Sequence, residues 1–338
     1  MKPGLPQSNL NMDALLPLWA EVASSGMWTE GRFVRSFEAK VAELYSKPAV
    51  AFNSAGTALY SVLRVLGLER VIAPTNTFWA TVGMAKEAGC TVTLADCGPD
   101  LSLSLDSVQA AYKGTEQAVI LTHVGGGVAK DYVAIAAWCK SNNLLLIEDA
   151  AHAFGITGPV APGSLGTAAV FSFYPTKAVP MGEGGVAVCN NEYLAYELAT
   201  FRNYGKYKQN GVIKYRGTGF NFRMDEWTAA VACYQMGRLQ EIMALRNQDA
   251  EVLSKIVKPL VTWDQTNWYK FIAPSSFPAK RQVGKVYART DQCHHIIGET
   301  GFPNAEAMSD AHICLPLGEG MYADMSTDQV ESYLRGVE

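Results

Sequence analysis

Short apolar runs alternate with helix-like segments between residues 49 and 189 of the chain. The runs are too short for helices, whereas the segments between them repeat apolar residues with the spacing of a helix face. This alternation is typical of parallel βαβ units, in which helices cover both faces of one sheet. The expected strands are Ala49–Phe52, Val71–Ala73, Thr91–Ala95, Ala118–Thr122, Leu144–Glu148, Ala168–Phe173 and Gly185–Cys189.

Two of the connecting helices can be delimited from the pattern. The first has an apolar face formed by Leu59, Val62, Leu63 and Leu66. Gly67 follows that face and is expected to cap the C-terminus of the helix. Asp131 stands at the N-cap position of the second helix, which ends near residues 141–143 and leads into the strand Leu144–Glu148.

The rhythm changes after Cys189. We expect a helix over Glu192–Arg202, a polar stretch up to Thr218, and then one long helix from Asp225 to Leu253 that links two domains. Beyond Val257, prolines separate short periodic runs, which favours a small α+β domain. The prolines are Pro259, Pro274, Pro278 and Pro303.

We therefore predict an α/β fold with two domains. The large domain, residues 1–240, would hold a mostly parallel seven-stranded sheet between helices, and residues 241–338 would form a small, shortened C-terminal α+β domain. Within this division, packing of the N-terminal segment on the small domain is left open. The triplet Gly125-Gly126-Gly127 indicates only a local turn.

Composition excludes several classes of protein. The 338 residues are 49% hydrophobic and 18% charged, with a net charge of −4 and no basic block, so disorder, coiled coil and nucleic-acid binding are poor interpretations. No apolar run approaches the about 18 residues of a membrane span. Residues 1–6 lack the apolar core of a signal peptide, so we expect a cytoplasmic protein without a membrane partner.

The seven cysteines are odd in number and form no CxxC pair, so we expect reduced core residues.

Polar residues at the carboxyl ends of the expected strands are the candidates for chemistry, because ligands bind outside these ends in a parallel sheet. The first set, Asn53-Ser54-Ala55-Gly56-Thr57, lies between a strand and a helix. Its small residues would let backbone N–H groups and the positive end of the helix dipole approach an anion such as a phosphate. Small residues in such a turn can also serve packing alone.

The second set is Glu148-Asp149-Ala150-Ala151-His152. A carboxylate at the end of so apolar a strand must be paired, bind a metal or face a cleft. The simpler alternatives are that Asp149 caps the next segment and that His152 is a hydrogen-bonded core residue. We expect no metal, because the other histidines form no spaced ligand set with these acids and Cys293-His294-His295 reads as a coincidence in a loop.

The third set is Ser172-Phe173-Tyr174-Pro175-Thr176-Lys177, followed by Gly182-Glu183-Gly184-Gly185. A lysine beside a cleft can have a lowered pKa and form a Schiff base with a carbonyl compound, although a solvated loop lysine is the common alternative. Together the three sets supply what pyridoxal phosphate needs: an anion cradle, a carboxylate for the pyridine nitrogen and an amine for the aldehyde. Phe78 follows another strand end and is either the aromatic cover of the ring or a core residue.

These residues stand in motifs that resemble the DegT/DnrJ/EryC1/StrS family of sugar aminotransferases, which have fold type I of the pyridoxal-phosphate enzymes. The resemblance covers most of the chain, and the order of the motifs carries it. The motifs are Ser25–Gly31, Phe37-Glu38, Asn53–Leu59, Pro74–Thr81, Glu148–Ala153, Ser172–Lys177, Gly182–Gly185, Arg202–Gly205, Gly219–Met224 and Ala229-Ala230, with weaker matches at Asn267–Phe271, Pro303–Glu306 and Leu315–Leu317.

The resemblance implies a role for each matching residue. Lys177 would carry the cofactor as the internal aldimine and act as the acid and base that moves the proton between the amino-bearing carbon and C4′. Asp149 would pair with the pyridine nitrogen, and His152, where the family often has glutamine, would contact the ring hydroxyl. The other cofactor contacts would be Ala55, Gly56, Thr57, Ser172 and Phe78, and the substrate-binding loop would include Gly26, Trp28 and Thr29. Asn221 would reach the cofactor phosphate of a neighbouring subunit, which implies a homodimer with shared active sites.

The activity implied by the resemblance is a ping-pong aminotransferase of amino-sugar and polysaccharide biosynthesis. An amino acid, by resemblance glutamate, would convert the cofactor to pyridoxamine phosphate, and a nucleotide-linked keto sugar would then accept the amine. Lysine at position 177 separates the chain from the dehydratase branch, which has histidine there. The chain after Leu253 is shorter than usual for the family, which leaves open an aminotransferase for a small non-nucleotide substrate, such as an aminocyclitol or amino-acid precursor. A non-catalytic cofactor-binding sensor or scaffold is a separate alternative, against which the intact Lys177 argues.

Overall fold

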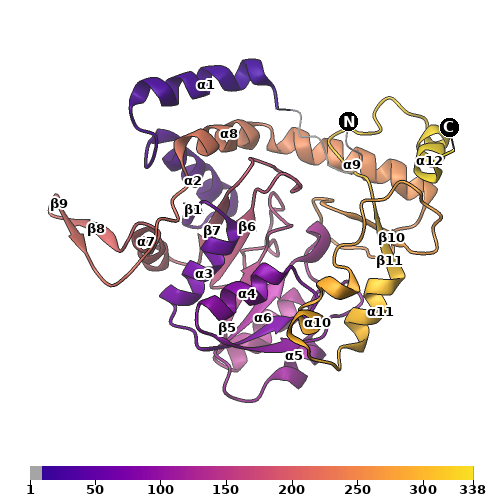
Figure 1. The fold of residues 1–338 in the computed structure, drawn as a ribbon, viewed down its shortest axis with the longest axis horizontal. Helices are drawn as coiled ribbons and strands as arrows, with labels where there is room; N and C mark the ends of the chain where they lie inside the picture. Colours follow the sequence, from indigo (N-terminus) through magenta and orange to yellow (C-terminus); the bar gives the residue numbers. More distant parts are fainter. Residues whose placement is uncertain (1–9, 338) are drawn as a thin grey trace.

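Seven strands form the central sheet of the computed structural model, which describes residues 10–337 (Figure 1). The strands are β1 (Ala49–Phe52), β2 (Arg70–Pro74), β3 (Thr91–Ala95), β4 (Ala118–Thr122), β5 (Leu145–Asp149), β6 (Ala168–Ser172) and β7 (Gly185–Cys189). Their order is β1-β7-β6-β5-β4-β2-β3, and only β7 runs antiparallel to its neighbours. The predicted seven-stranded, mostly parallel sheet is confirmed, with every strand end within one residue of the expectation. Residues 1–6, which entered the signal-peptide argument, lie outside the described part of the chain.

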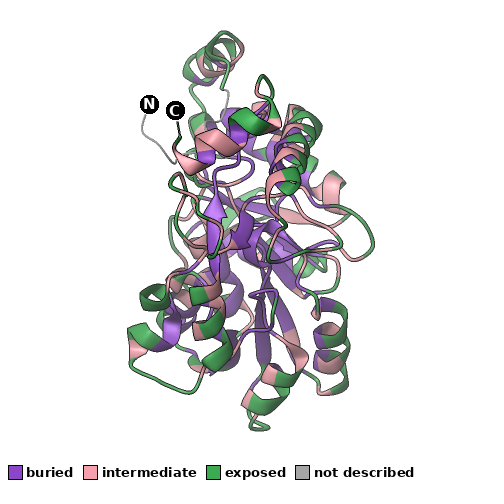
Figure 2. Cartoon of the chain, turned by 90° about the vertical axis from the view of Figure 1, so that its right-hand side faces the viewer, coloured by how far each residue is buried: buried purple, intermediate pink, exposed green. Residues whose placement is uncertain are grey.

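Both faces of the sheet are buried because successive side chains of a strand point to opposite sides. Val50 and Phe52 belong to one core and Ala51 to the other. The first core packs beneath α3 (Ala55–Val65), α4 (Trp79–Glu87) and α7 (Glu192–Phe201). The second face is covered by α2 (Arg32–Tyr45), α5 (Leu105–Ala111), α6 (Tyr132–Ser141) and α8 (Glu226–Gly237). Figure 2 shows the buried sheet between helices whose outer sides are exposed.

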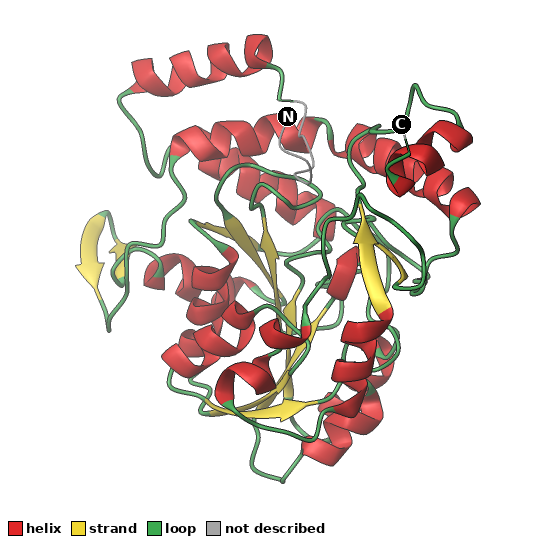
Figure 3. Ribbon diagram, turned by 45° about the vertical axis from the view of Figure 1, so that its right-hand side comes forward, coloured by secondary structure: helices red, strands yellow, loops and turns green. Residues whose placement is uncertain are grey.

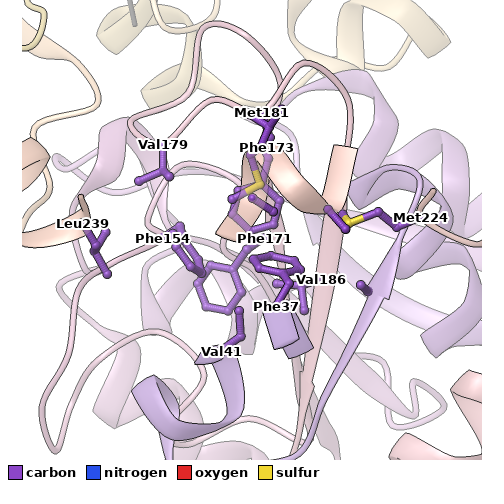
Figure 4. Packing of buried hydrophobic residues seen from close by; sticks show 14 of the residues in the cluster. Phe37, Val41, Phe154, Phe171, Phe173, Val179, Met181, Val186, Met224 and Leu239 are labelled. Atoms are coloured by element: carbon purple, nitrogen blue, oxygen red, sulfur yellow. The ribbon is translucent and has the colours of Figure 1, made fainter. Parts of the chain in front are cut away.

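An aromatic cluster fills the core between the sheet and the helices α2 and α8 (Figure 4). Phe173 stands at its centre, with ring centroids 5.4 Å from Phe37 and 4.8 Å from Phe154. The helix α1 (Met12–Ser25) adds Leu15 and Val22 to this cluster and packs on α8. The described N-terminal segment therefore packs on α8 and the core beside the sheet.

The expected single helix from Asp225 to Leu253 is wrong in one respect, because two helices occupy this range. α8 ends at Gly237, α9 spans Leu239–Ile256, and Arg238 between them has a backbone conformation outside the helical region. Glycine has a low helix propensity, which favours the break. α9 begins in the core beside the seven-stranded sheet, with Leu239 and Ile242, and ends in the separate core around β10 and β11. The predicted boundary at residue 240 thus falls within a helix, and the division stays a prediction.

The polar stretch before residue 218 is also more ordered than expected. It forms a hairpin of β8 (Lys206–Gln209) and β9 (Val212–Tyr215), which projects from the body at the left of Figure 1. Asn210 and Gly211 make the turn with positive φ values of 53° and 80°. An Asn-Gly pair between strands is a strong hairpin signal, so the sequence carried evidence for this element.

The C-terminal part of the chain forms a small α+β unit at the right of Figure 1, and Figure 3 shows its two strands among helices and long loops. β10 (Phe271–Pro274) pairs antiparallel with β11 (His312–Leu315). The helical segments are η2 (Arg289–Asp291), α10 (Cys293–Ile297), α11 (Pro303–Ala311) and α12 (Thr327–Arg335). A core of its own joins the strands to α12 and the end of α9 through residues such as Leu253, Phe271, Leu315 and Leu334.

The glycine triplet proves to be more than a local turn. It lies at η1 (Val124–Gly126), where the segment that leads into β10 docks on the large part of the chain. Asn267 donates its backbone N–H to Gly126 O (2.9 Å), and Lys270 donates to Gly125 O (2.9 Å). A Cβ atom at Gly126 would collide with Asn267 and Tyr269, and one at Gly127 would collide with Trp263. The triplet therefore permits a close backbone approach that the local pattern did not reveal.

Smaller expectations have mixed outcomes. Asp131 occupies the expected N-cap position of α6, but its carboxylate accepts a hydrogen bond from Leu105 N (2.8 Å) at the start of α5.

All seven cysteines are free, and six of them are buried while Cys233 is half-buried. Across the described residues, each helix is too short or too polar to span a membrane.

Candidate active site

A cavity of about 590 Å³ opens at the carboxyl-end edge of the sheet. The three sequence sets all reach its wall, because β1, β5 and β6 end at this edge and β7, which is antiparallel, begins there. The opposite wall comes from the small unit, through Tyr269, Lys270, Lys285 and Tyr287. The cavity therefore lies between the sheet and the C-terminal part of the chain.

Lys177 reaches the cavity from the turn after β6, where its N–H donates to Tyr174 O (2.9 Å). Its Nζ lies 4.9 Å from the centre of the Tyr269 ring. Burial lowers the pKa of Lys177, against the opposing effect of Tyr269 and Asp149. A lysine with a lowered pKa has more of the neutral amine that attacks carbonyl carbons.

Asp149 ends β5 and faces the same cavity. Thr81 on α4 donates its hydroxyl to Asp149 Oδ2 (2.5 Å), and Ala151 N–H donates to Oδ1 (3.1 Å). Thr77 lies within hydrogen-bond distance of Thr81 (2.8 Å) and of Thr122 (3.2 Å), so three hydroxyls support the carboxylate. Such a fixed, nearly buried carboxylate is suited to pair with a protonated ring nitrogen.

The neighbouring carboxylate, Glu148, has a different role. It is fully buried on the opposite face of β5 and lines no part of the cavity. It accepts four hydrogen bonds, from His123 Nε2 (3.0 Å), Tyr132 OH (2.7 Å), Gly163 N (2.6 Å) and Gly166 N (2.7 Å). These donors satisfy the buried charge and tie β5 to the loop that precedes β6.

His152 lines the cavity as a neutral hydrogen-bond donor. Gly125 N–H donates to its Nδ1 (3.3 Å), so its ring proton is on Nε2. Burial lowers its pKa well below the ordinary value, and the positive charges of Lys177 and Lys270 lower it further. The His152 ring centroid lies 4.5 Å from that of Tyr269. A neutral Nε2–H can donate to a hydroxyl or phenolate oxygen in the cavity, as a glutamine amide would.

The N-terminus of α3 forms an anion site on the large-domain wall. Ser54 caps the helix by accepting from Thr57 N (3.1 Å), and the N–H groups of Ala55 and Gly56 have no partner within the helix. Ser54, Ala55 and Gly56 line the cavity together with Ser172. Gly185 allows β7 to approach this turn, because a Cβ atom there would collide with Ala55 N. Free N–H groups at a helix start are suited to a phosphate.

Five of the candidate site residues do not line this cavity. Thr57 is beside the cradle but does not line the cavity, and its hydroxyl donates to Asn53 Oδ1 (2.6 Å). Gly26, Trp28, Thr29 and Asn221 also lie outside this cavity. Phe78 does line it, but at the mouth, where the side chain is 66% exposed.

Several residues of the wall were missed by sequence reasoning. Thr81, Thr122 and Glu183 belong to quoted motifs or strands, but nothing in the pattern marked them as functional. Tyr269 and Lys270 stand in the weak match Asn267–Phe271, while Lys285 and Tyr287 stand in no motif. Burial would raise the pKa of Tyr269, but the ammonium groups of Lys177 and Lys270 outweigh it and lower that pKa.

The position of Tyr269 depends on two buried anchors. Asn267 donates its side-chain amide to His152 O (2.8 Å) and Phe154 O (2.9 Å) of the large domain. Arg246 of α9 donates to Asn267 O (3.1 Å) and Tyr269 O (3.2 Å). These bonds hold the small-unit wall against the sheet edge and so complete the cavity.

The prediction that Cys293-His294-His295 lies in a loop is wrong, because these residues begin the helix α10. The folding of α11 beside α10 brings Glu306 near both histidines, and the potential ligand atoms of the three residues lie within 4.8 Å of one another. His294 Nδ1 is 2.6 Å from Thr75 Oγ1. The cluster lies outside the cavity described above.

The residues on the cavity wall fit pyridoxal phosphate. The α3 N–H groups and Ser172 can hold a phosphate, Asp149 can hold a protonated pyridine nitrogen, and Lys177 supplies the amine. His152 can donate to the ring oxygen. This assignment gives a partner to the free N–H groups at the start of α3 and to the Asp149 carboxylate, for which the described residues offer no other role.

Known proteins of one family resemble this chain in sequence. The model of the DegT/DnrJ/EryC1/StrS aminotransferase family matches residues 13–269. GDP-perosamine synthase of Caulobacter vibrioides is 33% identical over 224 residues, which are 64% of this chain and 60% of that protein. The match thus spans less than two thirds of that relative. The spore coat polysaccharide biosynthesis protein SpsC of Bacillus subtilis is 32% identical over 94% of this chain and 92% of its own length.

A solved structure extends the likeness to the whole fold. PseC of Helicobacter pylori, an aminotransferase involved in the biosynthesis of pseudoaminic acid, superposes with a TM-score of 0.89 at 21% identity, covering 100% of this chain and 99% of that one. The family match and the long alignment with SpsC show that this chain belongs to the DegT/DnrJ/EryC1/StrS aminotransferase family.

Proposed function

We propose that this chain is a pyridoxal-phosphate-dependent aminotransferase that moves an amino group from an amino acid, glutamate, to a nucleotide-linked keto sugar. The observation that carries the proposal is the convergence of Lys177, Asp149 and the start of α3 on one cavity. Family membership and a relative named GDP-perosamine synthase support a sugar as the acceptor.

The cofactor, when bound, supplies an electron sink that stabilises negative charge on the amino-bearing carbon. Lys177 would hold the cofactor through its side-chain amine, and the same amine, when free, would carry the proton between the amino-bearing carbon and C4′. The lowered pKa of Lys177 favours this role, because a base must be neutral to accept a proton.

The other residues of the cavity wall hold the cofactor and fix its orientation. Asp149, fixed by Thr81, keeps the pyridine nitrogen protonated, and the neutral His152 donates its Nε2–H to the ring oxygen. Ser54, Ala55, Gly56 and Ser172 bind the phosphate. Phe78 covers the ring at the mouth of the cavity.

We further propose a homodimer with shared sites. Asn221, Gly26, Trp28 and Thr29 lie outside the cavity of their own chain, as expected if they complete that of a partner. Trp28 is 57% exposed, and its ring centroid lies 6.3 Å from that of Trp227, so a neighbouring subunit would bury an apolar pair. Light scattering on the purified protein tests this: a monomer at micromolar concentration contradicts it. Cytoplasmic localisation stays a prediction.

The test of the activity is spectroscopic. Purified protein loaded with pyridoxal phosphate is expected to show the visible band of the lysine-bound cofactor, glutamate to remove it, and a nucleotide-linked keto sugar to restore it. Lys177→Ala should abolish the band and turnover. Absence of the band in the wild type, or full turnover in Lys177→Ala, would refute the proposal.

The same experiment separates the alternatives from the sequence. If the pyridoxamine form is discharged by a keto-cyclitol or keto acid and not by any nucleotide sugar, the acceptor is a small non-nucleotide molecule. If the band forms but glutamate and other amino acids fail to change it in a single turnover, the chain is a sensor or scaffold.

A further inference from the structure

Two lysines of the cavity wall have no part in the proposed cofactor site. Lys270 precedes β10, and Lys285 lies two residues before Tyr287. Both line the wall that the small unit contributes, across the cavity from the α3 cradle. Neither belongs to the residues that the proposed chemistry needs.

Few negative charges lie near the ammonium groups of these two lysines. Within residues 10–337, neither Nζ forms an ion pair with a carboxylate oxygen within 4 Å. Lys270 Nζ lies 4.9 Å from the centre of the Tyr269 ring, and Lys285 donates to Ser309 O, which leaves further ammonium protons free. The carboxylates that line the cavity are Asp149, which Thr81 holds, and Glu183.

The segments that carry the two lysines both pack against β11 at Cys314. Cys314 is on β11 and pairs with Ile272 of β10. The backbone of Val283 donates to Cys314 O (2.9 Å), and Cys314 N donates to Gly284 O (2.8 Å), so β11 fixes the segment that carries Lys285.

This cationic wall is distinct from the phosphate cradle. The cradle consists of backbone N–H groups at the start of α3, whereas the lysines stand on segments anchored to β10 and β11. A cofactor phosphate held at α3 therefore leaves the lysines available. Positive charges in a partly enclosed cavity attract an anion more strongly than the same charges in bulk water would.

We propose that Lys270 and Lys285 form an anion subsite, which binds an acidic group of a substrate, a carboxylate or a phosphate, next to the reacting centre. The inference rests on the proposed function and deepens it, because it assigns these two lysines to the acidic group of one of the two substrates. Two sources have this chemistry, the side-chain carboxylate of the amino donor and the diphosphate of a nucleotide-linked acceptor.

The test uses the variants Lys270→Met and Lys285→Met, which keep the unbranched stem and remove the charge. Lys258→Met is the matched control, because Lys258 is exposed just after α9 and lies outside the cavity. Lys270→Arg, which keeps the charge, should recover most of the loss. Circular dichroism and thermal unfolding show which variants fold; either methionine variant alone is sufficient for the test.

The two half-reactions distinguish the sources. If the subsite takes the donor carboxylate, the half-saturating concentration of glutamate rises about tenfold per lysine, the size expected for one charge-assisted hydrogen bond. The half-saturating concentration of norvaline, which has a methyl group in place of the side-chain carboxylate, is then unchanged. If it takes the acceptor diphosphate, the glutamate step is unchanged, and the half-saturating concentration of the nucleotide-linked keto sugar rises by the same factor.

A binding measurement is independent of turnover. Calorimetric titration of the cofactor-loaded protein with inorganic pyrophosphate and with glutarate should show at least one of them binding about tenfold more weakly to each methionine variant than to Lys258→Met. The proposal is overturned if both probes bind all variants equally and neither half-reaction changes. Failure of the proposed function looks different: the wild type would then lack the visible band or the half-reactions themselves.

Discussion

The neighbouring carboxylates of β5 allow a sharp prediction, because Glu148 and Asp149 point to opposite faces. Replacing Glu148 by glutamine keeps the size of the side chain and removes its charge. The carboxylate accepts from four donors, including Tyr132 OH at 2.7 Å and Gly166 N at 2.7 Å. A glutamine amide has one acceptor oxygen, and its NH2 group must face donors, so at least two of the four bonds are lost.

The magnitude follows from these two bonds. A hydrogen bond to a charged group contributes about 1.5–3 kcal/mol, so the loss is about 3–6 kcal/mol in the free energy of unfolding. Domains are stable by only about 5–15 kcal/mol, so the Glu148→Gln variant should unfold at clearly lower denaturant concentration. The lysine-bound cofactor, if the protein folds, should keep its visible band, because Glu148 does not line the cavity.

The assay is urea unfolding of cofactor-free protein, with Asp149→Asn as the matched control. Asp149→Asn loses far less stability in this assay, because Asp149 accepts two hydrogen bonds where Glu148 accepts four, yet it should bind pyridoxal phosphate much more weakly. The reasoning is refuted if Glu148→Gln changes the unfolding free energy by less than about 1 kcal/mol, or if it weakens cofactor binding as much as Asp149→Asn does.

Three further predictions concern the site and its docking. Thr81→Val removes the hydroxyl that holds Asp149, so the affinity for pyridoxal phosphate should fall about 10-fold or more in an absorbance titration, and an unchanged affinity would contradict the support role. Burial lowers the pKa of Lys177 from its ordinary 10.5, so the rate at which cofactor-free protein captures pyridoxal phosphate should rise with pH and level off below pH 10.5. A rate that levels off only above pH 10.5 would contradict the lowered pKa. Gly126→Ala places a Cβ against Asn267 and Tyr269 at a positive φ of 93°, so the melting temperature should fall by several degrees, whereas Gly211→Ala, also at positive φ but with nothing near its Cβ, should cost less.

Much of the sheet could be predicted because its signals are local. A strand with both faces buried reads as a short apolar run, and the turn residues that follow it mark its end. The same logic located Gly56, Asp149, Ser172 and Lys177, since chain order alone places them after strands of one sheet. The break at Arg238 was missed because the apolar pattern continues through it, although Gly237 precedes it.

The β8–β9 hairpin illustrates a different kind of miss. Its Asn210-Gly211 turn was visible in the sequence, but its strands are only four residues long and mostly exposed, so they lack the buried apolar runs used to find the others. The element projects from the body of the chain, and exposed strands of this kind follow from turn chemistry more than from burial.

The sequence by itself determined the sheet, the family resemblance and the residues at the ends of the strands, because these depend on neighbours in the chain. The resemblance assigned Asp149 to the site, but the physical reason is tertiary: adjacent strand residues point to opposite sides, and packing leaves Asp149 at the cavity and buries Glu148 on the other face. Only the tertiary structure decided that Tyr269, Lys270 and Lys285 complete the wall. These residues reach the sheet edge through the docking of Asn267 at the glycine triplet, a contact between distant segments that no local pattern encodes.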